Sequence, residues 1–210
     1  MKVNINDLIS KNGMLYLKSE DKLFEGSIVG KLNVKVVKGL LEGECKTYYD
    51  SGELKEKYNY LSSKIEGKFY SYYKSGCLNW KGNYINNKRN GKWLQVNEDG
   101  KTLKISHFVN DTENGEWKTY NSDGILLYKY NYKLGLQVDD FFSYYDNANL
   151  KVHGLYLDGV KNGTWLTYYK SGKLLERCTW KNGKLFGEFL SYHDNCQLWE
   201  SCYFIDDKLE

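Results

Sequence analysis

The chain repeats itself every 24 residues. Residues 67–76 read GKFYSYYKSG, residues 115–124 read GEWKTYNSDG and residues 163–172 read GTWLTYYKSG. Similar rows begin at seven positions, six with Gly and one with Asp: 43, 67, 91, 115, 139, 163 and 187. A fixed period of this length is typical of stacked supersecondary units, in which each unit packs on its neighbours in the chain.

Each row contains two turn signals, and we number its residues as places 1 to 24. Asp158-Gly159 and Asn182-Gly183, at places 20 and 21, predict a two-residue hairpin turn with positive φ. Places 7 to 10 usually end in Gly and predict a four-residue loop whose last residue is left-handed. Two strands of about eight or nine residues fit between the turns. Each row therefore predicts one antiparallel β-hairpin.

The spacing also predicts a register. A four-residue first loop sets places 1, 3 and 5 opposite places 16, 14 and 12 and needs no bulge, whereas a three-residue loop would need a bulge in every repeat. Because side chains alternate between faces, one face carries places 1, 3, 5, 12, 14, 16 and 18, with two aromatic rows, a Leu row and a Gly row. We expect these glycines to let the rings lie flat on the backbone. The other face carries Tyr and more charge.

Composition agrees with a sheet protein. The 210 residues include 20 Tyr, 20 Gly, no Pro and a single Ala. Aromatic residues favour strands, and Ala favours helices. We predict an all-β fold with seven hairpin repeats in one continuous domain over residues 43–210. Residues 1–42 do not fit the row and predict an irregular β cap that protects the first edge strand.

The segment GTWLTYYKSGKLLERCTWKNGKLFGEF resembles the bacterial variant of the MORN repeat, of the form G-x-W-x-x-Y-x-x-x-G-x-L, then an aromatic, then N-G-x-x-x-G. The resemblance extends over about residues 43–210. It implies an elongated, single-layer, twisted antiparallel meander of MORN-type hairpins and a non-enzymatic interaction role. Bacterial members are commonly labelled antitoxins or immunity partners of polymorphic toxins. Asp139, Ala148, Cys196 and Val96-Asn97 depart from the pattern.

The cysteines and histidines predict no reaction centre. Cys178 and Cys202 share a place in adjacent rows, about 9.6 Å apart, which exceeds the reach of a disulfide. No Cys/His spacing suits a metal, so free thiols are expected. His193 and Cys196 share a loop and raise the alternative of a Cys–His nucleophile, without an evident orienting group or oxyanion pocket. We predict a protein that is not an enzyme, with no cofactor and no metal.

The charged residues at place 15 are the most informative. We expect a residue at place 15 to lie beside the residues at place 2 of its own row and of the next row. Lys129 would then lie between Glu116 and Asp140, and Arg177 beside Glu188. Lys81 would instead meet Lys68 and Lys92. The candidate partner-binding patch consists of Lys55, Lys57, Lys68, Lys81, Lys92, Tyr48, Tyr70 and Tyr72. It reads either as a solvated lysine surface or as a docking site for an acidic protein, because Tyr is enriched at binding hot spots.

The leading functional hypothesis is a protein-binding scaffold of the antitoxin or immunity type. The alternative is a module that binds anionic lipid at a membrane surface or mediates adhesion to a host. Nucleic acid is not expected, since the formal net charge is only +3. The N-terminus lacks a secretory signal, and no window supplies the roughly 20 apolar residues of a membrane span, which predicts a cytoplasmic protein. The partner's identity, the binding face and the oligomeric state stay open.

Overall fold

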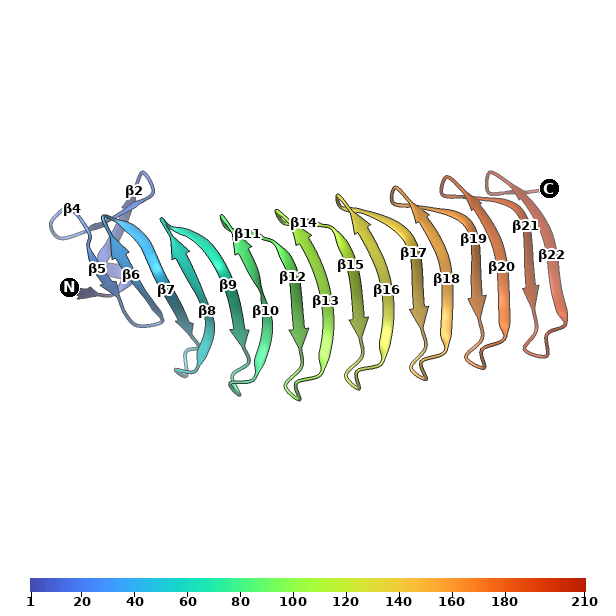
Figure 1. Ribbon diagram of the computed structural model, residues 1–210, viewed down its shortest axis with the longest axis horizontal. Coiled ribbons are helices and arrows are strands. Elements are labelled where there is room, and N and C mark those ends of the chain that lie inside the picture. Colours follow the sequence, from blue (N-terminus) through green and yellow to red (C-terminus); the bar gives the residue numbers. More distant parts are fainter. The chain divides into compact units, whose positions relative to one another are not determined.

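The computed structural model describes residues 1–210 and contains two compact units. The first consists of residues 1–101 and 109–111, and the second of residues 102–108 and 112–210. Within each unit, the strands from β5 onward lie side by side in chain order as an open antiparallel sheet (Figure 1). The one helical element is a single 3-10 turn, η1 (Ile5–Asp7). The predicted all-β antiparallel meander is confirmed.

The first unit starts with an irregular segment. The strands β2 (Leu8–Lys11), β3 (Met14–Leu17) and β4 (Lys22–Leu23) form a small antiparallel sheet of their own. The strand β1 (Lys2–Val3) pairs in parallel with β5 (Gly26–Ile28), a contact that the sequence did not suggest. The remaining strands of this unit are β6 (Leu32–Val37), β7 (Leu40–Tyr48), β8 (Leu54–Leu61), β9 (Lys64–Tyr72), β10 (Leu78–Ile85), β11 (Lys88–Arg89) and β12 (Gly91–Val96).

A buried cluster joins this irregular segment to the first hairpins. Phe24, Ile28 and Val36 are almost completely buried, and Cys45 and Tyr58 from the repeats pack in the same cluster. The first repeats thus share a hydrophobic core with residues that precede them. The division of the chain at residue 42 stays a prediction.

The second unit consists of hairpins only. Its strands are β13 (Thr102–Val109), β14 (Thr112–Glu113), β15 (Gly115–Tyr120), β16 (Leu126–Lys133), β17 (Leu136–Tyr144), β18 (Leu150–Leu157), β19 (Val160–Tyr168), β20 (Leu174–Lys181), β21 (Lys184–Tyr192), β22 (Leu198–Ile205) and β23 (Lys208–Leu209). Neighbouring long strands pair antiparallel, as β19 does with β20 and β20 with β21.

The second turn of each row has the predicted conformation. In the row that contains Asp158 and Gly159, these residues have φ of 48° and 84°. Both central residues of a two-residue turn of this kind need positive φ. Residues with a side chain adopt the same conformation elsewhere, as Ser62 (49°) and Ser63 (62°) do. The turn geometry is therefore imposed by the pairing of the strands and does not depend on Gly.

The first loop of each row differs from the prediction. In the first row, the amide of Tyr49 donates to the carbonyl of Glu53, so the loop holds three residues, and it ends at Gly52 with φ of 101°. Thr47 then lies opposite Glu56 and Tyr48 opposite Leu54, with a bulge between them. The four-residue loop without a bulge is therefore wrong. The left-handed residue lies at the predicted place, but the loop begins one residue later, and the bulge restores the parity of the faces.

The role predicted for the glycines at place 1 is also wrong. Gly43 and Gly67 have φ of 77° and 81°, and a Cβ atom on either would meet nothing within 4 Å. These glycines supply the left-handed backbone of a second irregularity in the pairing. The glycines at place 16 are the ones that leave room for the rings. A Cβ on Gly82 would lie 2.2 Å from Cδ2 of Trp93, and one on Gly154 would lie 2.1 Å from Cδ2 of Trp165.

The rings at places 3, 16 and 18 share one face, as predicted. In the second unit, Trp117 stacks on Tyr130 with centroids 6.3 Å apart, Tyr130 on Phe141 at 6.1 Å, and Phe141 on Trp165 at 5.8 Å. Tyr156 meets Trp165 edge-on at 5.2 Å. Such contacts add roughly 0.5–1.5 kcal/mol each to the burial of the rings. This row of rings is the core of a sheet that has no second layer.

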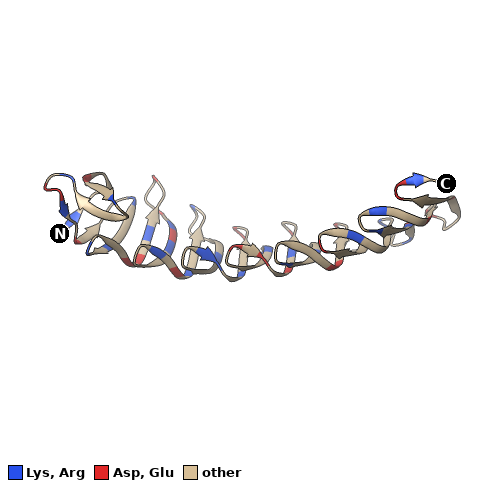
Figure 2. Cartoon of the chain, turned by 90° about the horizontal axis from the view of Figure 1, so that it is seen from above, with Lys and Arg blue, Asp and Glu red and all other residues tan.

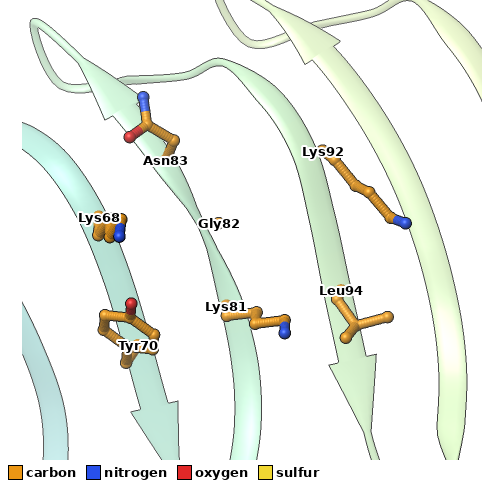
Figure 3. A pocket seen from close by; sticks show the side chains of 7 residues that line it. All are labelled: Lys68, Tyr70, Lys81, Gly82, Asn83, Lys92 and Leu94. Carbon is orange, nitrogen blue, oxygen red and sulfur yellow. The ribbon is translucent and has the colours of Figure 1, made fainter.

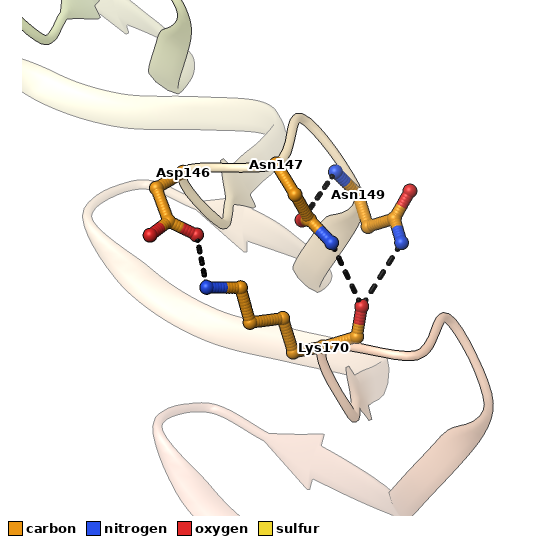
Figure 4. Close-up of polar contacts among 4 residues, drawn as sticks. All are labelled: Asp146, Asn147, Asn149 and Lys170. Carbon is orange, nitrogen blue, oxygen red and sulfur yellow. Dashed lines mark hydrogen bonds and ion pairs between the residues drawn. The ribbon is translucent and has the colours of Figure 1, made fainter.

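The first loops of successive rows lie next to one another in each unit, and hydrogen bonds join each of these loops to the next row. The Tyr169 hydroxyl donates to the carbonyl of Tyr192 at 2.8 Å, and Tyr49, Tyr73 and Tyr145 make the equivalent bond one row on. The loop at Lys170 is joined to the previous loop by its ammonium, 2.6 Å from Asp146, and by its carbonyl, which accepts from Asn147 and Asn149 (Figure 4). These bonds fix the spacing of successive rows.

Candidate functional site

The structure gathers part of the predicted patch into one groove. Lys68 and Tyr70 lie on β9, Lys81 on β10 and Lys92 on β12. Together with Gly82, Asn83 and Leu94 they line a shallow groove of about 370 Å³ across these three neighbouring strands (Figure 3). We call this surface the basic groove. It lies within the first unit, on the face opposite to the row of rings.

The register decides which of these side chains meet. Lys81 lies directly opposite Tyr70 on one side and Leu94 on the other. Lys68 lies opposite Asn83, so it is a diagonal neighbour of Lys81. Place 15 therefore faces place 4, and the expected direct pairing with place 2 is wrong because the bulges shift the register. Diagonal neighbours in a sheet are about 7–8 Å apart, which long lysine side chains still span.

The basic groove carries positive charge without internal compensation. Lys68, Lys81 and Lys92 are exposed, and none of them lies within 4.0 Å of a carboxylate. Tyr70 and Leu94 are half-buried and give the groove an apolar floor between the ammonium groups. The groove can therefore hold an anionic group that also brings apolar surface.

The other predicted residues lie elsewhere. Lys57 is 2.7 Å from Glu44, and Lys55 lies over the ring of Tyr49. Tyr48 lines a separate hollow with Lys46, and Tyr72 lies opposite Leu78 at the end of its strand. None of these four predicted residues, Lys55, Lys57, Tyr48 and Tyr72, lines the basic groove.

Three residues of the groove were missed from the sequence, namely Gly82, Asn83 and Leu94. A signal was available for Leu94. It occupies the same place in its row as Tyr70, and the register sets both against Lys81. This signal can be recognised only when the bulged register is known, and the residue spacing alone does not give that register.

In two other clusters the lysines are paired with a carboxylate. Figure 2 shows basic and acidic residues interspersed along the strands. Glu44 lies 2.6 Å from Lys46 and 2.7 Å from Lys57, and these contacts, led by the hydrogen bond from Lys46, lower the pKa of Glu44 to about 2. In the second unit, Glu116 lies 2.6 Å from Lys118 and 3.6 Å from Lys129, as predicted for Lys129, and the pKa of Glu116 is lowered chiefly by Lys118.

Two of the expected charge pairs are absent. Asp140 pairs with His153 at 2.8 Å, and Lys129 contacts only Glu116 of its two expected partners. Arg177 forms no ion pair with Glu188, because Leu190 and Leu166 lie directly opposite it.

The depressed pKa of Glu44 predicts a pH dependence. Its ordinary value is 4.5, and the native value is about 2, so the carboxylate stabilises the fold fully above pH 4.5 and loses this contribution as the pH falls towards about 2. We expect a carbon-detected NMR titration to give a midpoint well below 4.5 for the side-chain carboxyl. Lys46→Met should raise that midpoint towards 4.5. A midpoint near 4.5 in the unmodified chain would contradict the ion-paired geometry.

The remaining chemical candidates do not converge on a reaction centre. All five cysteines are free thiols. The His193 ring stacks on Trp199 at 5.3 Å and forms no hydrogen bond with Cys196, whose left-handed backbone (φ of 68°) occupies the last position of the loop. No three His, Cys, Asp or Glu side chains come together in a way that could hold a metal ion. None of the helical structure is long or apolar enough to cross a membrane.

Comparison with known proteins finds a repeat family to which parts of the chain are similar. Residues 41–61, 113–134 and 161–182 match a family model described as a MORN repeat variant. A search of curated proteins gave no match. Repeats of this family are binding modules and not a known class of enzyme, and they often mediate binding to proteins or membranes. The chain is thus similar to MORN repeat proteins of the variant type in three of its seven rows.

Proposed function

We propose that this chain is a non-enzymatic scaffold whose basic groove docks an acidic segment of a protein partner. The observation that carries the proposal is the set of three ammonium groups in the groove without a neighbouring carboxylate. Complementary charge accelerates association and selects partners, and the half-buried Tyr70 is of the type enriched at binding hot spots.

The finer form of the proposal is an antitoxin or immunity role in the bacterial cytoplasm. The partner would be a toxin whose acidic surface is covered by the sheet. A preorganised sheet loses little conformational freedom on binding, which favours tight masking of a surface. The resemblance of the repeats to the MORN variant motivates this role, and the charge of the basic groove is compatible with it.

A charge reversal in the groove tests the proposal. We expect a fluorescein-labelled hexaglutamate peptide to bind the chain at low ionic strength and more weakly as salt is added, because exposed charges are screened. Lys81→Glu should weaken binding by about tenfold or more in fluorescence anisotropy. The control is Lys184→Glu, which changes net charge equally at an exposed position on β21 and should bind as the unmodified chain does.

Two further arms separate the alternatives. Vesicles that contain phosphatidylserine report on anionic lipid, and a single-stranded DNA oligonucleotide reports on nucleic acid. Binding of the vesicles without binding of the peptide would replace the protein partner by a membrane surface. Equal affinity of Lys81→Glu and the unmodified chain for the peptide would show that the basic groove is not the docking site.

A further inference from the structure

Two clusters outside the basic groove share one design, one of them in each unit. In the first row, Glu44 at place 2 contacts Lys46 at place 4 and Lys57 at place 15. In the fourth row, Glu116 contacts Lys118 and Lys129, which occupy the same two places. The two lysines lie opposite each other in the ladder in both rows, as Lys46 and Lys57 do.

The two oxygens of the carboxylate are divided between two lysines in both clusters. One oxygen of Glu44 faces Lys46 and the other faces Lys57, at 2.6 Å and 2.7 Å. The two oxygens of Glu116 are likewise divided between Lys118 and Lys129, at 2.6 Å and 3.6 Å. The surface of this repeat thus has a recurring position where a single carboxylate bridges two ammonium groups.

The basic groove is the copy in which this carboxylate is replaced by a cation. Lys81 occupies the place of Lys57 and Lys129, whereas Lys68 and Lys92 occupy the place of Glu44 and Glu116. Tyr70 stands where Lys46 and Lys118 stand. The groove keeps one of the two lysines of the site, the one at place 15, loses the internal acid, and gains two lysines at place 2 of adjacent strands.

We infer that the basic groove is an open copy of this carboxylate site, and that it receives an Asp or Glu side chain of the partner bridged between the ammonium group of Lys81 and that of Lys68 or Lys92. The inference rests on the proposed function and names its recognition chemistry. In both closed clusters the chain itself places a carboxylate oxygen beside the lysine at place 15, the place of Lys81. The lowered pKa of Glu44 indicates how strongly two ammonium groups favour the bound anion.

The first test introduces a carboxylate of the chain itself into the basic groove. Lys68→Glu restores the acid at place 2 that the first and fourth rows have, so the new carboxylate should pair with Lys81 and the hexaglutamate peptide should bind at least about tenfold more weakly. Lys184→Glu is the control for net charge and should leave binding unchanged. Lys68→Gln, which removes a charge but supplies no carboxylate, should have an effect between the two.

The second test removes the internal carboxylate from the cluster around Lys129. Glu116→Lys combined with Asp140→Lys gives the fourth and fifth rows the charge arrangement of the basic groove, with Lys129 at its centre. We expect this variant, with Lys81→Glu added to remove the original site, to bind hexaglutamate. Glu116→Gln alone, with Lys81→Glu, offers a milder opening if circular dichroism shows that the double replacement unfolds the sheet.

The outcomes distinguish this inference from the proposed function. If the unmodified chain binds hexaglutamate and Lys68→Glu binds equally well, the bridged-carboxylate site is wrong while the acidic partner stands. If the unmodified chain fails to bind the peptide, the proposed function fails, and the inference fails with it. Binding of inorganic phosphate in preference to the peptide would identify the groove as a phosphate site and overturn the carboxylate assignment.

Discussion

Trp165→Ala should lower the free energy of unfolding by about 3–5 kcal/mol, the range for removal of a buried Trp. The side chain is 5% exposed, stacks on Phe141 and meets Tyr156 edge-on. Its Nε1 donates to the carbonyl of Leu155 at 3.2 Å. Because the sheet has a single layer here, no opposite element can collapse into the space that is left. Chemical denaturation followed by circular dichroism measures the loss.

Gly154→Ala tests the same contact from the backbone side. Its Cβ would lie 2.1 Å from Cδ2 of Trp165, so the indole must move, and overpacking of this kind costs about 1–3 kcal/mol. In the Trp165→Ala background the clash disappears. Gly154→Ala should then be neutral or stabilising, since Gly weakens a strand interior. A double-mutant cycle with no coupling between the two positions would contradict the packing described above.

An exposed Trp provides the matched control. Trp199 is 67% exposed, and Trp199→Ala should change the free energy of unfolding by no more than about 0.5 kcal/mol. A similar loss from Trp165→Ala and Trp199→Ala would show that ring burial does not stabilise this face.

Phe24→Ala should cost a comparable 3–5 kcal/mol in the first unit. Phe24 is 1% exposed and shares a cluster with Ile28, Val36 and Cys45, the last of which belongs to the first repeat. Its backbone also joins two segments, because its amide donates to Leu15 and its carbonyl accepts from Gly39. The substitution should weaken the irregular N-terminal segment and the first hairpin together.

Hydrogen exchange identifies where that loss occurs. In Phe24→Ala, the amides of β7 and β8 should lose protection along with those of β5 and β6. Leu23→Ala is the control, because Leu23 is the neighbouring residue and is 36% exposed, so its truncation should cost well under the loss at Phe24. Unchanged protection of β7 in Phe24→Ala would mean that residues 1–42 fold apart from the repeats.

Local signals explain what could be predicted of the basic groove. Lysines at places 2 and 15 indicated a cluster, and the structure brings Lys68, Lys81 and Lys92 together. Lys55 and Tyr72 were included because they are near in sequence, yet they lie at other places in the row and do not line the groove. A lysine is neutralised when its diagonal neighbour on the adjacent strand is an acid. Which residue is the diagonal neighbour depends on the register of the two strands.

The sequence by itself determined the period, the positions of the two turns in each row and the face on which Trp117 and Trp165 lie, because turn chemistry and side-chain alternation act between residues close in the chain. The tertiary structure decided the bulges, the contact of Trp165 with Gly154, the parallel pairing of β1 with β5 and the open charge at Lys81. Each of these depends on how far one strand is shifted along the next. That shift results from a balance among loop closure, backbone hydrogen bonding and ring packing, which no single row contains.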